Sequence, residues 1–442
     1  MILYITEEDM IDLLEGMRVV ELASYIMGPI AGKVLAEWGA EVIKVEPMLR
    51  DTWNPADGDG DMIRGAGMAR AIVNGDPCVW EFVNGSKKSV CIDTRKKEGY
   101  KAMIDLCLSA DVVILHIRPS DAKKLKVDYE SLSKKKPGII VASASGYGNE
   151  GPDAERGGFD AVAFAARSGM INALSPEGQP CIPYYGMGDV TSGTYLASAI
   201  MAAYIKKLKT GRGEDISVSL YGSAIWTAGI PVMTSYYGDP YPTPRTAQLP
   251  TANPFRCADG KWIYLMGNVW VTALDGLCSI MDLPADAKQR WPSYPEAMKH
   301  KAEIIALLDE QFAKHPRNYW LEKLATTRIP YDVLADFKDV QHDEQAWAAG
   351  FLVKNPVDGY DVGVPTTPAQ FRNAGSPEIT MNYPGEHTVE QFRAIGYTDE
   401  RIQQLLDLGV MSQLDPETYE YDRFNITKPG STYNVIMGGS AM

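Results

Sequence analysis

An alternation of strand-like and helix-like segments constrains the fold of this chain more than any other feature. Residues 17–22 have the pattern of a strand, and Gly28-Pro29 ends it. Residues 30–38 have the pattern of a short helix, and residues 41–46, rich in β-branched side chains, form the next strand. The alternation continues with a helix expected at 97–108 and strands expected at 112–116 and 138–143. Strands that alternate with helices predict a parallel sheet with right-handed crossovers. We therefore expect an α/β protein whose large domain has a Rossmann-like parallel sheet.

The length of the chain predicts a second domain, because 442 residues exceed the comfortable size of one hydrophobic core. The pattern changes near residue 221, and a proline- and tyrosine-rich connector follows at 236–244. We predict that residues 1–220 form the first part of the large domain and that residues 221–339 form a smaller α+β domain with its connectors. Residues 340–442 are expected to return to the large domain or to lie along a partner.

Composition excludes several classes of protein. With 45% hydrophobic and 23% charged residues, the chain is typical of a soluble globular protein, and it has no evident secretory signal or bilayer span. Its six cysteines are scattered without a CxxC pair, and its five histidines lack metal-ligand spacing. We expect a cytoplasmic protein with reduced thiols and no metal site.

The charge distribution is uneven. A net charge of −14 argues against a nucleic-acid surface, yet residues 86–136 carry 13 basic and seven acidic side chains. This basic segment is compatible with a small polyanionic ligand. The alternative is a solvated surface of mixed charges, which is the better interpretation for most of these lysines.

Asp189 is the candidate nucleophile, because its carboxylate stands among small residues directly before a helix expected at 194–208. Glycine on its amino side, at Gly188, lets a large ligand approach closely, and an approachable carboxylate suits covalent catalysis. The alternative is that Asp189 caps the helix, which this segment alone favours. A dehydrogenase is disfavoured, because the first turn, residues 23–28, lacks the GxGxxG fingerprint.

A series of short motifs resembles class III CoA-transferases in order along nearly the whole chain. The opening motif is Gly28-Pro29 followed by Leu35-Ala36-Glu37-Trp38-Gly39-Ala40-Glu41-Val42-Ile43-Lys44-Val45-Glu46. The further motifs lie at 84–90, 145–148, 158–160, Gly188-Asp189, 210–214, Pro330, Asp343 and 345–347. Each motif is weak alone, but their joint order is specific. The details are most similar to the branch that acts on 2-hydroxyacyl and aryl-acryloyl thioesters in anaerobic amino-acid fermentation.

The resemblance implies a CoA-transferase in which Asp189 attacks an acyl-CoA thioester and then carries CoA as an aspartyl thioester to a free acid. The acid would be a 2-hydroxy acid such as phenyllactate or 2-hydroxyisocaproate. Backbone N–H groups near Met27 and Gly188 would stabilise the oxyanion, and Tyr185 would contact the substrate. The resemblance also implies coenzyme A as a co-substrate, no permanently bound cofactor, and an interlocked homodimer.

The residues that would bind CoA follow from the same resemblance. They are the cations Lys44, Lys87, Lys88 and Lys124, together with the motif Ser145-Gly146-Tyr147. Two departures from the family pattern are Pro47, where some members carry arginine, and Ser145, which replaces a lysine. Residues 245–254 lack the polyglycine loop of members specific for oxalate-like acids. An apolar acyl pocket could be walled by Met27, Tyr184, Tyr185, Trp226, Tyr236 and Tyr237.

Two alternatives remain at the level of sequence. A 2-methylacyl-CoA racemase would share the fold, but its relatives usually place a histidine base where this chain has Phe159, which cannot abstract a proton. A CoA-binding protein without turnover would not need Asp189. Thioester exchange distinguishes both from a transferase.

Overall fold

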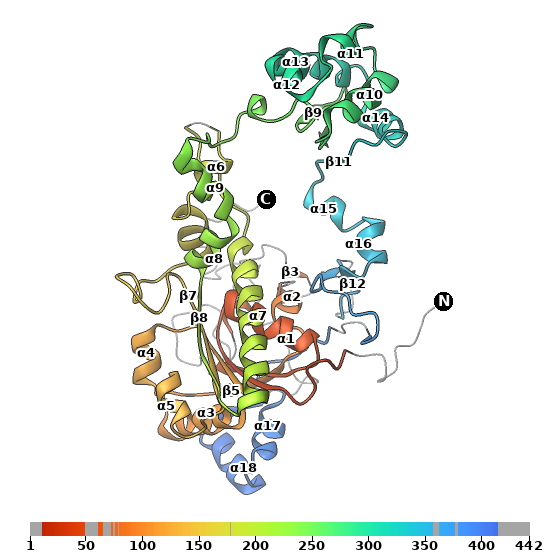
Figure 1. Cartoon of the computed structure of the whole chain (residues 1–442). Helices are drawn as coiled ribbons and strands as arrows, with labels where there is room; N and C mark the ends of the chain where they lie inside the picture. The colour runs from red at the N-terminus through yellow and green to blue at the C-terminus, as the bar shows by residue number, and fades with distance from the viewer. Residues whose placement is uncertain are drawn as a thin grey trace, which may run out of the picture. The chain divides into compact units, whose positions relative to one another are not determined.

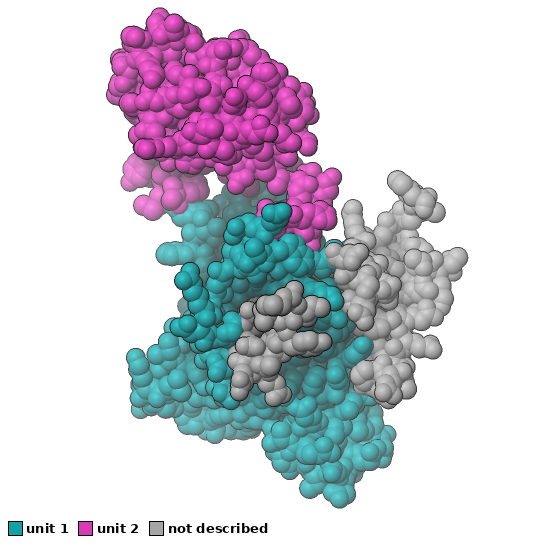
Figure 2. Space-filling view, turned by 90° about the vertical axis from the view of Figure 1, so that its right-hand side faces the viewer, with its two compact units in different colours: residues 1–171, 182–229, 344–442 teal, residues 172–181, 230–343 magenta. Residues whose placement is uncertain are grey.

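The structure is a computed structural model that describes residues 11–48, 61–64, 72–73, 76–77, 79–176, 178–356, 362–375 and 379–413 (Figure 1). The described residues belong to two compact units (Figure 2): unit 1 within Met1–Ile171, Ile182–Gly229 and Glu344–Met442, and unit 2 within Asn172–Cys181 and Ile230–Asp343. The sequence placed the boundaries at 220 and 339. It did not anticipate that the short segment Asn172–Cys181 belongs to unit 2.

A seven-stranded sheet forms the centre of unit 1, in the order β14-β5-β2-β1-β6-β7-β8. All neighbours pair in parallel except β14, which is antiparallel to β5. The strands are β1 (Arg18–Leu22), β2 (Glu41–Pro47), β5 (Lys88–Ile92), β6 (Val112–Leu115), β7 (Ile140–Ser145), β8 (Asp215–Ser219) and β14 (Met411–Ser412). The six parallel strands run outward in both directions from β1, which is the doubly wound Rossmann order. The predicted α/β parallel sheet is confirmed.

Both faces of this sheet are buried, because neighbouring residues of each central strand point into different cores. Val19 of β1 packs with α1 (Met27–Glu37) and α7 (Met187–Thr210), whereas Val20 packs with α3 (Lys97–Ser109) and the carboxyl-terminal helices. Because both faces are buried, most side chains of these strands are apolar on either face, and the charged residues Glu21, Lys44 and Glu46 are buried in ion pairs.

The remaining helices of unit 1 surround the sheet. They are α2 (Trp80–Asn84), α4 (Pro119–Lys124), α5 (Tyr129–Ser133), a π-helix η4 (Asp160–Ala166), α8 (Leu220–Thr227), α16 (Glu344–Ala348), α17 (Thr388–Ala394) and α18 (Asp399–Asp407). Short hairpins are formed by β3 (Ile72–Val73) with β4 (Asp76–Pro77) and by β12 (Leu352–Val353) with β13 (Val364–Pro365).

Unit 2 has its own core around a three-stranded antiparallel sheet, in the order β11-β10-β9. Its main elements are β9 (Pro254–Arg256), β10 (Trp262–Leu265), α10 (Trp270–Ile280), α11 (Ala287–Arg290), α12 (Tyr294–Lys299), α13 (Lys301–Phe312), α14 (Arg317–Leu324), β11 (Tyr331–Val333) and α15 (Phe337–Val340). Phe255 stacks on Phe312 with ring centroids 4.9 Å apart, which joins the sheet to α13. Two helices contain residues of both units, α6 (Met170–Leu174) and α9 (Gly229–Thr234). In the described part of the chain, no helix has the length and apolar character needed to cross a bilayer.

Candidate active site

A cavity of about 510 Å³ lies at the carboxyl ends of the parallel strands of unit 1. Ser24-Tyr25-Ile26 enters its wall just after β1, residues 116–119 after β6, and Ala144-Ser145-Gly146 at the end of β7. β1 and β6 are neighbours from which the chain winds in opposite directions. The cavity therefore occupies the topological switch point, where open α/β sheets bind ligands.

Asp189 reaches this cavity from the first turn of α7. The expectations that Asp189 precedes the helix and that the helix begins at residue 194 are wrong, because α7 begins at Met187 and its N-cap is Gly186 at φ +79°. A side chain at that backbone angle would be strained. The small polar residues that follow are helical, since the hydroxyls of Thr191 and Thr194 donate to carbonyls four residues earlier.

The side-chain cap of α7 comes from another element. Asp160, the first residue of η4, accepts the backbone N–H of Gly188 at 2.9 Å and those of Gly186 and Met187. A Cβ at Gly188 would lie 2.5 Å from Asp160 Oδ1 and 2.2 Å from Phe164 Cγ. Glycine is therefore needed at 188 for the close approach of η4 to α7.

The two carboxylates at the start of α7 have different surroundings. The carboxylate of Asp160 accepts from the N–H groups of the helix, whereas the carboxylate of Asp189 forms no hydrogen bond or ion pair with any described residue. Burial, with the nearby charge of Asp160, raises the pKa of Asp189 to about 7. A helix amino terminus would ordinarily lower an acid's pKa, but here its donors already bind Asp160.

Aromatic side chains line the cavity near Asp189. Tyr25 adopts φ +66°, a left-handed conformation unusual for a tyrosine, and its ring meets Phe159 edge-on at 5.7 Å between centroids. Tyr184 and Tyr185 line the same cavity and remain mostly exposed. Burial and the charge of Asp189 raise the pKa of Tyr185. This wall suits an apolar or aromatic group bound beside the carboxylate.

Two arginines supply positive charge to the cavity. Arg118 is the N-cap of α4, and its guanidinium forms no hydrogen bond or ion pair with any described residue. The guanidinium of Arg156 lies over the Tyr147 ring, 5.1 Å from its centroid. Both suit binding of an anionic group such as a phosphate. In the described residues, no three His, Cys, Asp or Glu side chains are grouped as metal ligands would be.

The structure brings some of the predicted site residues together. Asp189, Tyr185, Ser145 and Gly146 line the cavity. Others lie beside it: Met27 begins α1 directly after Ile26 of the wall, Gly188 precedes Asp189, and Tyr147 follows Gly146. Of the further aromatic residues considered for an acyl pocket, Tyr184 lines the cavity, Trp226 does not, and Tyr236 and Tyr237 belong to unit 2.

The predicted lysines do not line this cavity. Lys44 and Lys87 are buried and both pair with Glu21, while Lys88 begins β5, away from the carboxyl ends of the strands, and pairs with Glu41 and Glu390. Lys124 is exposed at the end of α4. The sequence interpretation omitted Asp160, Tyr25, His116, Arg118 and Arg156 from the site. The signal was their position at the carboxyl end of a predicted strand, His116 as the last residue of the strand expected at 112–116 and Tyr25 and Arg118 just after predicted strands.

Comparison with known proteins agrees with this architecture. The model of CoA-transferase family III matches residues 14–388. The chain belongs to this family. It is an enzyme, a class III CoA-transferase.

Two relatives of this CoA-transferase match along most of their lengths. It is 33% identical over 404 residues to (R)-2-hydroxy-4-methylpentanoate CoA-transferase of Clostridioides difficile, covering 90% of this chain and 99% of the relative. It is 29% identical over 414 residues to cinnamoyl-CoA:phenyllactate CoA-transferase of Clostridium sporogenes, covering 90% and 97%. Among solved structures, a CAIB/BAIF family protein from Brucella suis matches with a TM-score of 0.73 and 26% identity, over 86% of this chain and 99% of that one.

Proposed function

We propose that this enzyme moves CoA from an acyl-CoA thioester to a free carboxylic acid through covalent intermediates on Asp189. The observation that carries the proposal is the carboxylate of Asp189 in the switch-point cavity, which forms no hydrogen bond or ion pair with the residues that the structure describes and has its pKa raised to about 7. A carboxylate that is more basic and less hydrogen-bonded than usual is a stronger nucleophile toward a thioester carbonyl.

Each step of this mechanism exchanges one acyl bond for another. The Asp189 carboxylate attacks the thioester carbonyl, the carbon–sulfur bond breaks, and CoA leaves as a thiolate, giving a mixed anhydride. The thiolate attacks the Asp189 acyl carbon and releases the donor acid, giving an aspartyl-CoA thioester. The acceptor acid then reverses the two steps. Backbone N–H groups at the start of α1, including that of Met27, are proposed to stabilise the oxyanion.

We propose a 2-hydroxy acid with an apolar side chain as one of the two acids. The aromatic residues Tyr25, Phe159, Tyr184 and Tyr185 favour such a group. The printed names of both relatives concern acids of this kind, 2-hydroxy-4-methylpentanoate and phenyllactate. Arg118 and Arg156 are proposed to bind the phosphates of CoA, as a co-substrate rather than a permanent cofactor. We also propose a cytoplasmic location, because the six cysteines are scattered along the sequence without a CxxC pair.

Mass spectrometry tests this function directly. The enzyme is mixed with an aryl-acryloyl-CoA or a 2-hydroxyacyl-CoA and a panel of free 2-hydroxy acids. We expect new CoA thioesters and, in the intact protein, an adduct on Asp189. Asp189→Ala should lower the rate by at least about 10³-fold, whereas Asp121→Ala, which also alters a cavity carboxylate, should retain transfer.

The same experiment separates the alternative. If no acid accepts CoA while the α-carbon of the thioester exchanges deuterium, a racemase of the same fold replaces the proposed transferase. If transfer persists in Asp189→Ala, the covalent role of this residue is wrong even though the family is correct.

A further inference from the structure

A buried group of charges lies directly beneath the loop that forms one wall of the cavity. Glu21, in β1, is fully buried; its Oε1 accepts from Lys44 Nζ at 2.9 Å and its Oε2 accepts from Lys87 Nζ at 2.9 Å. Burial opposes ionisation of Glu21, but the two ammonium groups hold its pKa below the usual value. These three side chains are called the Glu21 triplet below.

The two lysines also bind the backbone at both ends of the cavity loop. Lys44 Nζ donates to the carbonyl of Ala23 at 2.8 Å, and Lys87 Nζ donates to the carbonyl of Pro29 at 2.7 Å. Between these points lie Tyr25 in its left-handed conformation and the first residues of α1. The Glu21 triplet thus connects the start and the end of a seven-residue segment, 23–29.

A third contact holds the middle of the same loop. His116 Nδ1 lies 3.1 Å from the carbonyl of Ser24, so this nitrogen carries the proton and donates. Burial lowers the pKa of His116, which favours the neutral ring. The carbonyls of Ala23, Ser24 and Pro29 therefore all bind side chains from other parts of the sheet.

The surrounding structure is shaped to accept the triplet. A Cβ at Gly32 of α1 would lie 2.1 Å from Glu21 Oε2, so only glycine leaves room for this carboxylate under the helix. The loop also packs on the start of α7: a Cβ at Gly193 would lie 2.5 Å from the carbonyl of Met27. A displacement of the loop would consequently change its position relative to Asp189.

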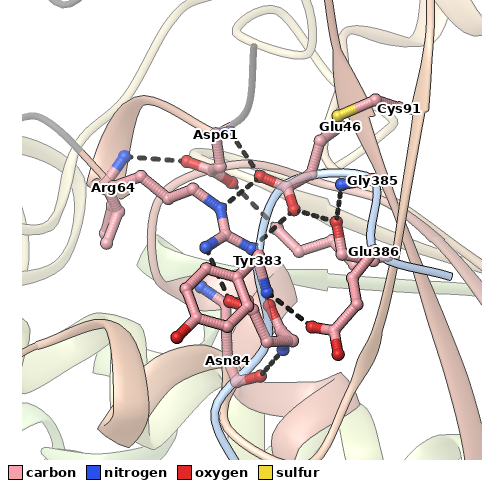
Figure 3. A network of polar contacts seen from close by, with 12 residues as sticks. Glu46, Asp61, Arg64, Asn84, Cys91, Tyr383, Gly385 and Glu386 are labelled. Atoms are coloured by element: carbon pink, nitrogen blue, oxygen red, sulfur yellow. Dashed lines mark hydrogen bonds and ion pairs between the residues drawn. The ribbon is translucent and has the colours of Figure 1, made fainter. Parts of the chain in front are cut away.

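A neighbouring network of polar contacts, centred on Glu46 and Arg64, contacts a different part of the chain. Figure 3 shows Arg64 paired with Glu46, and the side chain and carbonyl of Asn382 accept from Arg64. Asp61 joins the two groups, because its N–H donates to Glu46 while its carboxylate pairs with Lys44. The Glu46–Arg64 network binds the carboxyl-terminal segment, whereas the Glu21 triplet binds the cavity loop.

We propose that Glu21, Lys44 and Lys87 are positioning residues that hold the 23–29 loop, with Tyr25 and the first N–H groups of α1, in place opposite Asp189. Their role is to preorganise the loop for the transition state without touching the substrate. The consequence for catalysis rests on the proposed function; the consequence for the loop does not. Misplacement of such a wall by about 1 Å can lower a rate by about 10²-fold.

The test compares Lys87→Met with Lys33→Met. Lys33 is a matched control, since it is also buried in unit 1 and binds Glu37 and the carbonyl of Gly85, but no carbonyl of the loop. We expect Lys87→Met to lower kcat by about 10- to 100-fold with KM changed less than about twofold. Lys33→Met should lower thermal stability, but it should not lower kcat while KM stays nearly unchanged.

Hydrogen exchange measures the loop independently of activity. Peptides that cover residues 23–29 should exchange faster in Lys87→Met than in the wild type or Lys33→Met. Because Lys87→Met leaves Glu21 with one partner fewer, the double variant Glu21→Gln/Lys87→Met, which removes one negative and one positive charge together, is measured in parallel. It should show the same loss of kcat and the same faster exchange.

The outcomes separate the two proposals. If the folded variants keep wild-type kcat, or if exchange in the loop is unchanged, the positioning role is wrong. If the wild type transfers no CoA but the loop is deprotected only in the triplet variants, the proposed reaction fails and the holding of the loop stands.

Discussion

At the scale of residues, two carboxylates, those of Asp160 and Asp189, lie at the start of α7 and differ in their hydrogen bonds. Asp160 binds the free N–H groups of the helix, and the half-buried carboxylate of Asp189 lies beside that charge. The helix is thereby capped while the Asp189 carboxylate stays available to the cavity. In the proposed mechanism the two aspartates have different roles, since Asp160 caps the helix and Asp189 reacts.

The pH dependence of transfer should report this pair. Attack requires the ionised carboxylate, so kcat/KM should fall about tenfold per pH unit below the Asp189 pKa of about 7. Asp160→Asn keeps a capping side chain and removes one charge that raises this pKa. In Asp160→Asn, the fall of kcat/KM at acidic pH should move to lower pH by less than about 1 unit, because burial is the larger cause of the raised Asp189 pKa.

Asp121→Asn is the control for this profile, since Asp121 lines the cavity but is not among the groups that raise the pKa of Asp189. Its fall of kcat/KM at acidic pH should stay near that of the wild type. A wild-type profile that is flat between pH 5 and 8 would contradict the assignment of Asp189.

The free energy of unfolding should also depend on the ionisation of Asp189, but in the opposite direction: activity should rise with pH, whereas stability should fall. The pKa of Asp189 is raised from 3.8 to about 7 on folding, so its favourable contribution is complete below pH 4 and is lost as pH rises through about 7. Asp189→Asn should therefore be more stable than the wild type at pH 8 by about 1 kcal/mol or more, after allowance for screening by solvent at the cavity. The difference should shrink at pH 5. Thermal unfolding at both pH values measures it, and equal stability at pH 8 would refute the buried charge.

At the scale of elements, the close contact of η4 with α7 positions both aspartates. Gly188→Ala adds a methyl group where Phe164 Cγ would lie 2.2 Å away, although alanine favours a helix. We expect a loss of about 1–3 kcal/mol in the free energy of unfolding, with lower kcat as the cap moves. Urea unfolding and steady-state kinetics measure the two effects.

Gly229→Ala provides the comparison, because a Cβ at Gly229 would meet nothing within 4 Å. It should be neutral or slightly stabilising. If Gly188→Ala behaves like Gly229→Ala, the close approach does not constrain the site.

At the scale of the whole molecule, unit 1 exposes large apolar side chains. Trp226 is 76% exposed and Leu208 70% exposed, on α8 and α7. Such residues are compatible with a protein interface, and we propose the interlocked homodimer that the family resemblance implied. Analytical ultracentrifugation should give twice the chain mass of 48.6 kDa across the micromolar range, and Trp226→Glu should weaken the association. A monomer at these concentrations would overturn the proposal.

Much of the fold could be read from local pattern, because strands and helices impose their own periods on the sequence. The strand expected at 41–46 and the helix expected at 97–108 match β2 and α3 to within one residue at each end. The start of α7 was misplaced, because glycine, serine and threonine look like a loop locally. In the structure they form the first turns of a helix whose N–H groups Asp160 accepts and against which Phe164 packs, both from another element.

The sequence by itself determined the parallel sheet, the family and the candidate nucleophile Asp189, since periodicity and ordered short motifs are properties of the chain. Only the tertiary structure decided what surrounds that nucleophile. Lys44 and Lys87 resembled phosphate ligands, yet folding places both against Glu21, because buried charges require opposite charges close by. Tyr25 and Arg118 enter the cavity for a different reason, because the segments after β1 and β6 meet where the carboxyl ends of parallel strands converge, and Asp160 joins them from η4.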